Sequence, residues 1–101
     1  MTTNEVQEIF KQCTEDCKKR IVLMEEMDIC DISLIDKNIE TCQQVSVSCS
    51  QSALKLFVLS QELPENSELK NKITEFISIL NDGIAEYNQL LQLLQEIKRA
   101  F

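Results

Sequence analysis

Apolar positions recur in alternating steps of four and three residues along three stretches of the chain. This spacing lines apolar side chains along one face of a helix, which is the row by which helices pack in bundles. We call such a row a seam. The pattern predicts helices at about residues 4–27, 34–62 and 68–100. The seam residues are Val6, Phe10, Cys13, Cys17, Met24 and Met27; Ile35, Ile39, Cys42, Cys49, Ala53, Leu56 and Leu63; and Leu69, Ile73, Phe76, Leu80, Gly83, Tyr87, Leu90, Leu94, Ile97 and Phe101.

The predicted helices are joined by short connections, so consecutive helices are expected to run antiparallel. The second connection contains Pro64, which ends a helix, and Asn66 or Ser67 can cap the next one. The whole chain has one glycine and one proline, too few for a turn-rich β fold. The sequence therefore predicts an all-α protein, a single antiparallel three-helix bundle over residues 1–101.

Two stretches weaken this pattern. Residues 45–52 alternate as a strand would and are rich in serine, a poor helix former. Asn81-Asp82-Gly83 is a turn signal, and a break there would give four helices. Because the seam keeps its helical phase across both stretches, we predict continuous helices and leave the four-helix bundle as the alternative.

The third predicted helix ends in an apolar stripe that is wider than one seam requires. The stripe either closes the bundle's own core or stays exposed and binds a partner protein or a second copy of the chain, giving a homodimer. The third helix is longer than the first, which would leave the stripe's far end without an intramolecular cover in the second case; of the two readings, we favour closure of the bundle's own core. The candidate partner-binding residues are Leu90, Leu91, Leu93, Leu94, Ile97 and Phe101.

The formal net charge is −7, and the only basic cluster is Lys18-Lys19-Arg20. Nucleic-acid binding is not expected, because phosphate backbones attract clustered cations. No segment is long and apolar enough for membrane insertion, and the first residues do not read as a signal peptide. These features together predict a cytoplasmic protein.

The chain has no histidine, so it cannot supply a Ser-His-Asp or Cys-His constellation. A glycine-rich phosphate loop is equally impossible with a single glycine. We therefore expect no enzyme and no cofactor. The leading hypothesis is a helical protein-protein interaction module of an adaptor, chaperone-like or regulatory kind.

Four of the five cysteines, Cys13, Cys17, Cys42 and Cys49, lie on predicted seams, where free cysteine packs as a small hydrophobe. Four thiolates between two helices could instead hold zinc or copper(I), or form a redox switch. No Cys-x2-Cys pair is present, so we favour packing. Cys30 falls in the first connection and is expected to be half-exposed.

Arg20 occupies a seam position of the first predicted helix. Long basic side chains usually pack their stem on apolar neighbours and extend the charged head into water. We therefore expect the Arg20 guanidinium to leave the edge of the seam and meet solvent.

The segment Ile73-Thr-Glu-Phe-Ile-Ser-Ile-Leu-Asn-Asp-Gly-Ile84 resembles the start of the last helix of GAT domains. GAT domains are three-helix modules of endosomal sorting adaptors. The resemblance covers about a dozen residues around Leu80, Asn81 and Asp82. It implies a ubiquitin-binding trafficking role, with an apolar patch on the first two helices or on the third.

Overall fold

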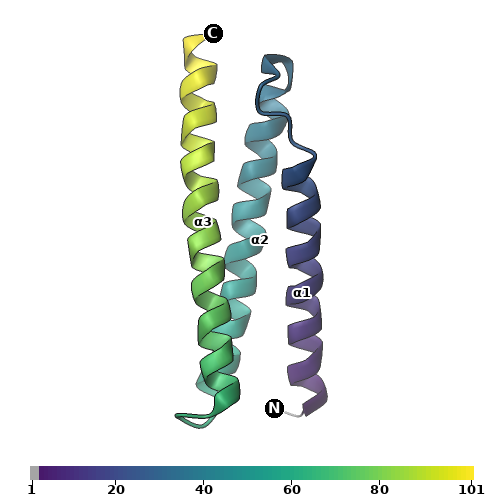
Figure 1. Cartoon of the computed structure of the whole chain (residues 1–101), viewed down its shortest axis with the longest axis vertical. Coiled ribbons are helices and arrows are strands. Elements are labelled where there is room, and N and C mark those ends of the chain that lie inside the picture. Colours follow the sequence, from purple (N-terminus) through teal and green to yellow (C-terminus); the bar gives the residue numbers. More distant parts are fainter. Residues whose placement is uncertain (1–2) are drawn as a thin grey trace.

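A computed structural model describes residues 3–101 as three long helices that run up, down and up (Figure 1). Helix α1 spans Thr3–Glu25, α2 spans Ile35–Gln61 and α3 spans Glu68–Ala100, and a 3-10 turn, η1, spans Ile32–Leu34. The molecule is a rod 53 Å long. The predicted all-α antiparallel three-helix bundle is confirmed, and the helix ends agree with the sequence pattern to within about two residues.

Helix α3 is continuous through Asn81, Asp82 and Gly83, so the four-helix alternative is wrong. The chain stays helical at this turn signal because the residues on both sides of it bury the same face of the helix against α2. Gly83 has room for a side chain, since a Cβ there would meet only the Tyr87 ring at 3.6 Å and Cys49 Sγ at 4.0 Å.

Helix α2 also stays helical through its serine-rich stretch. The Ser50 hydroxyl donates a hydrogen bond to the Ser46 carbonyl at 3.0 Å, as serines in helices often do. Facing α3, the buried Cys49 thiol donates to the Leu80 carbonyl at 3.3 Å. Small side chains on α2 thus allow the backbone of α3 to come close.

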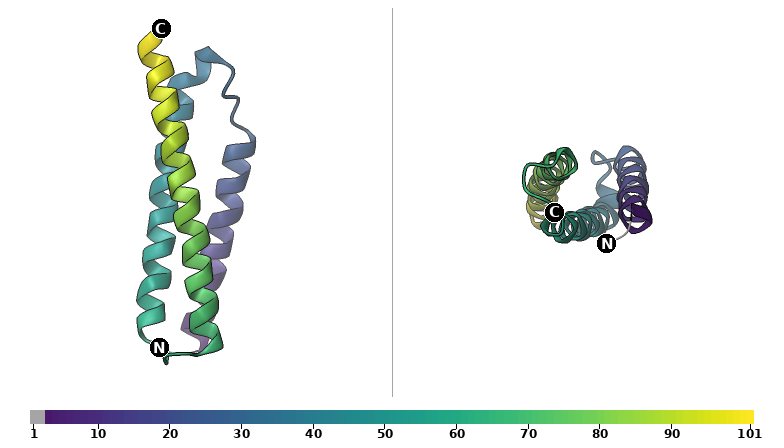
Figure 2. Two further views of the ribbon diagram at one scale, coloured as in Figure 1. Left: turned by 60° about the vertical axis from the view of Figure 1, so that its left-hand side comes forward. Right: turned by 90° about the horizontal axis from the view of Figure 1, so that it is seen from below.

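The three helices do not form a closed triangle. Helix α2 packs against both neighbours, whereas no Cα atom of α1 lies within 8 Å of one in α3 across the described chain. Seen from below, α3, α2 and α1 form a U with α2 at its base (Figure 2). On this side, between α1 and α3, the two helices meet only through side chains in the half of the rod that holds the core and leave a pocket near Arg20. We call it the open side of the bundle.

The apolar core lies in the half of the rod where α1 begins and α2 ends (Figure 1). All three helices contribute to it, and partly buried side chains such as Phe10 and Phe76 pack around it. The buried members of the core are Cys13, Cys49, Ala53, Leu56, Leu59, Ile73 and Leu80.

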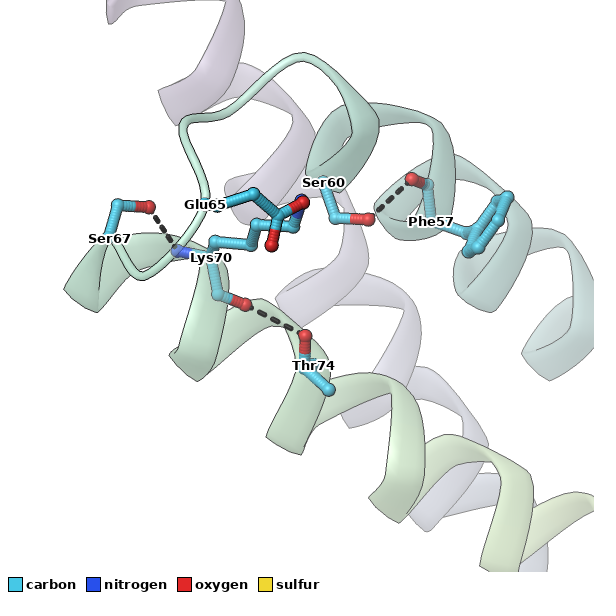
Figure 3. Close-up of polar contacts among 6 residues, drawn as sticks. All are labelled: Phe57, Ser60, Glu65, Ser67, Lys70 and Thr74. Atoms are coloured by element: carbon cyan, nitrogen blue, oxygen red, sulfur yellow. Dashed lines mark hydrogen bonds and ion pairs between the residues drawn. The ribbon is translucent and has the colours of Figure 1, made fainter.

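Polar contacts fix the turn between α2 and α3 (Figure 3). Ser67 is the N-cap of α3, and its hydroxyl accepts a hydrogen bond from the Lys70 amide at 3.1 Å. The Lys70 ammonium pairs with Glu65 at 2.7 Å. Asn66 takes the turn's left-handed conformation, with φ of 64°, which asparagine tolerates well. Of the two capping candidates, Ser67 is the one that caps.

Candidate interaction surface

The end of α3 lies beside the beginning of α2. The Lys98 ammonium pairs with the Asp36 carboxylate at 2.6 Å, and Ser46 donates a hydrogen bond to Asn88 at 3.1 Å. Helix α1 does not reach this level, because it ends at Glu25 and the chain then crosses to η1 (Figure 1). In this half of the rod α3 therefore has one helical neighbour instead of two.

The six predicted partner-binding residues divide between core and surface. Leu94 is only 2 % exposed, because it faces α2. Leu90, Leu91 and Ile97 are half-buried. Leu93 is 50 % exposed and Phe101 is 88 % exposed. One edge of the stripe is therefore buried and the other edge faces solvent, and partner binding through the exposed edge stays a prediction.

The exposed edge of this stripe continues along α3 toward the middle of the rod. Ile79, Glu86, Leu93 and Ile97 are separated by steps of seven or four residues, which places them on one face of the helix. Ile79 is among the exposed large apolar side chains. We call this row the outer face of α3.

The outer face of α3 borders a pocket of about 350 Å³ on the open side of the bundle. All three helices line the pocket: Cys17, Arg20 and Ile21 come from α1, Cys49 comes from α2, and a segment of α3 around Gly83 forms the opposite wall. The wall of α3 is low at Gly83 because glycine has no side chain.

Arg20 lines this pocket and is only 4 % exposed. Its Nη1 donates to the hydroxyls of Ser48 at 3.0 Å and Ser52 at 3.4 Å, and its Nη2 donates to Cys17 Sγ at 2.9 Å. The expectation that its guanidinium meets solvent is wrong, because two serines one turn apart on α2 accept its hydrogen bonds. Those serines were visible in the sequence as poor helix formers, and their pairing with a seam arginine is the signal that could have located this site.

The structure brings three of the four seam cysteines near one another and leaves Cys42 apart. Cys13 and Cys49 belong to the core, Cys17 packs against it and lines the pocket with Cys49, and Cys42 lies two turns before Cys49 on α2. Nowhere in residues 3–101 do three or more cysteine, aspartate or glutamate side chains lie where they could share a metal ion. The alternative of a four-thiolate metal site is therefore not assembled in this structure. Cys30 is exposed in the first connection.

Burial raises the pKa of the Cys13, Cys42 and Cys49 thiols above the ordinary value of 9.0. The unfolded chain therefore releases these protons at lower pH than the folded protein does, so the folded protein binds more protons above pH 9.0. We predict that the free energy of unfolding is constant near neutral pH and falls as pH rises from about 9 through the higher folded pKa values.

Urea titrations at several alkaline pH values measure this slope. A Cys42→Ala variant should show a shallower fall, and Cys30→Ala, which removes an exposed thiol, should leave the slope unchanged. Equal slopes for the two variants would contradict the assignment of the pH dependence to buried thiols.

A second exposed apolar row lies on α2 and was not predicted from the sequence. Val47, Leu54 and Val58 follow one another in steps of seven and four residues, and Phe57 lies beside them; all four are exposed. The seam of α2 accounts for only one set of its apolar residues, and this second row lies outside that seam. It provides a matched surface against which the outer face of α3 can be tested.

Comparisons with protein-family models, with curated proteins and with solved structures found no match to this chain. The resemblance of residues 73–84 to GAT domains stays a prediction. In the described part of the chain, no helix combines the length and apolar character needed to cross a membrane.

Proposed function

We propose that this protein is a non-enzymatic helical interaction module that binds another protein, or a second copy of itself, through the outer face of α3. The observation that carries the proposal is the exposure of Ile79 and Leu93 on this face, with Leu93 directly beside the buried Leu94. A large apolar side chain held on a rigid helix, next to a well-packed anchor, is typical of a helix-binding surface. A cytoplasmic setting is part of the same proposal.

The length of α3 supports this role. Its last turns extend past the end of α1, so their outer edge has no helical neighbour within the chain (Figure 1). The helix is nevertheless held in place, because Leu94 is buried and Lys98 pairs with Asp36. A partner would therefore meet a preformed surface and would pay little ordering entropy there.

The test compares two aspartate variants at exposed leucines. Leu93→Asp places a charge on the outer face of α3, and Leu54→Asp places one on the row of α2, where the leucine is 63 % exposed. We expect Leu93→Asp to abolish binding and Leu54→Asp to preserve it, because a buried carboxylate opposes burial of the apolar face. Sedimentation measures self-association, and quantitative affinity capture from the native cell measures partner proteins.

Circular dichroism and urea titration confirm that both variants are folded. If the wild-type protein sediments as a monomer and Leu93→Asp captures the same proteins in the same amounts, the outer face of α3 is not the binding surface. If only Leu54→Asp lost binding, the binding surface would be the exposed apolar row of α2.

A further inference from the structure

The guanidinium of Arg20 is hydrogen-bonded only to neutral groups. Its hydrogen-bond partners are two hydroxyls and a sulfur atom, and none of the ion pairs formed by residues 3–101 involves it. A buried cation without a counter-ion is costly, because neutral acceptors replace only part of its hydration. Arg20 also lines a pocket that opens to solvent, and the 4 % of its surface that stays exposed is where a ligand would meet it.

The rim of the same pocket carries the opposite charge. Asp82 and Glu86 lie one turn apart on α3, both are exposed, and neither takes part in an ion pair among the described residues. The pocket is thus lined by a buried cation on α1 and by two exposed carboxylates on α3. A ligand that matches this arrangement carries a carboxylate on its buried side and cations along one border.

The arrangement of the helices favours a helix as the ligand. The backbones of α1 and α3 stand apart on either side of α2 (Figure 2), side chains of both helices fill the space between them in the half of the rod that holds the core, and a pocket is left at the level of Arg20. Three helices around such a pocket resemble a four-helix bundle that lacks one member. Ile21 on α1 and Ile79 on α3 expose apolar side chains at the pocket. Ile79 to Ile97 covers about 27 Å of α3, the length of a five-turn helix; the part of α3 near Ile79 lines the pocket, and the part near Ile97 lies beyond the end of α1.

We propose that the open side between α1 and α3 binds one amphipathic helix of a partner protein, whose apolar face carries an aspartate or glutamate that pairs with Arg20. Lysine or arginine residues along one edge of that helix pair with Asp82 and Glu86. The inference rests on the proposed function and names the kind of partner that the outer face of α3 takes. A second copy of the chain is disfavoured as the occupant, because its net charge of −7 opposes self-association.

The test is a selection from a displayed library of designed five-turn helices. Leucine occupies most apolar-face positions, and two central apolar-face positions and both edges are randomised. The targets are the wild-type protein, Arg20→Met and the control Lys19→Met, which removes an exposed charge from the neighbouring residue. Peptides selected by the wild type and by Lys19→Met should carry Asp or Glu at one central position and Lys or Arg along one edge.

The energetic readout uses one selected peptide and its Glu→Gln partner, measured by fluorescence anisotropy. For the wild-type protein the Gln peptide should bind at least about tenfold more weakly, and for Arg20→Met the difference should fall below about twofold. The double variant Asp82→Asn with Glu86→Gln should lose the preference for basic edges and keep the preference for the carboxylate. This variant alters only exposed side chains, so it tests the edge pairing even if Arg20→Met fails to fold.

Selected helices without a central carboxylate, or the same helices selected by Arg20→Met, would overturn the inference. Competition by the unlabelled protein itself would overturn it too, because the occupant would then be a second copy. Peptides that bind without a carboxylate preference but are lost in Leu93→Asp would leave the proposed function intact. The opposite case is also distinguishable. If the selected peptides keep their preference for a carboxylate but Leu93→Asp captures the same native proteins as the wild type, the inference stands and the proposed function is wrong.

Discussion

Replacing Leu56 by alanine is expected to lower the free energy of unfolding by about 3–4 kcal/mol. Leu56 is 0 % exposed and belongs to the core that joins all three helices. The change removes buried methyl groups and leaves a cavity that a rigid bundle fills poorly. Domains of this size have a total stability of about 5–15 kcal/mol, so the variant should lose a large part of it.

Leu54→Ala is the matched control for this prediction. It makes the same chemical change two residues away on α2, at a side chain that is mostly in water. Urea titration should show a change within about 0.5 kcal/mol for this variant. Similar losses for the two variants would mean that the described core does not carry the stability of the bundle.

The second prediction concerns Arg20, whose replacement by methionine should leave the protein at least as stable as the wild type. Methionine fills a similar volume without requiring burial of a charge, and such exchanges are often neutral or stabilising. The freed hydroxyls of Ser48 and Ser52 can turn to helix carbonyls one turn back. Arg20→Ala should be less stable than Arg20→Met by about 2–3 kcal/mol, because it also removes packing.

Lys19→Met controls for the loss of one positive charge and should change the free energy of unfolding by less than about 0.5 kcal/mol. If Arg20→Met instead loses several kcal/mol, the hydrogen bonds of Arg20 hold α1 to α2. The residue would then be structural, and its role in partner recognition would lose its main support. Thermal and urea denaturation of the variants distinguish these outcomes.

Helix positions were predictable from this sequence because a helix has a single period. The bounds of α3 match the predicted range, and its continuity through Gly83 follows from the shared phase of Leu80 and Tyr87. Helical phase tells which face a residue occupies and does not tell how deeply its side chain is buried. Depth depends on the neighbouring helix, which a single sequence does not display.

Arg20 and Leu93 show this limit from opposite sides. Arg20 was expected in water and lies buried, because Ser48 and Ser52 on α2 accept its hydrogen bonds. Leu93 and Leu94 are adjacent in one apolar stripe, yet Leu94 is buried on α2 and Leu93 faces solvent. The open side of the bundle was also unpredicted, since periodicity fixes neither the angle between helices nor the closure of a bundle.

Because of the open side, the two outer helices, α1 and α3, are expected to differ in how easily they unfold locally. Helix α2 packs far more extensively on α3 than on α1, and α1 meets α3 only through side chains of the core. Amide protons of α1 should therefore exchange with solvent through local opening, while those in the middle of α2 and α3 exchange only when the whole chain unfolds. We therefore expect the hairpin of α2 and α3 to stay folded when α1 opens locally. A ligand bound between α1 and α3 should slow the hydrogen exchange of α1 more than that of the other helices.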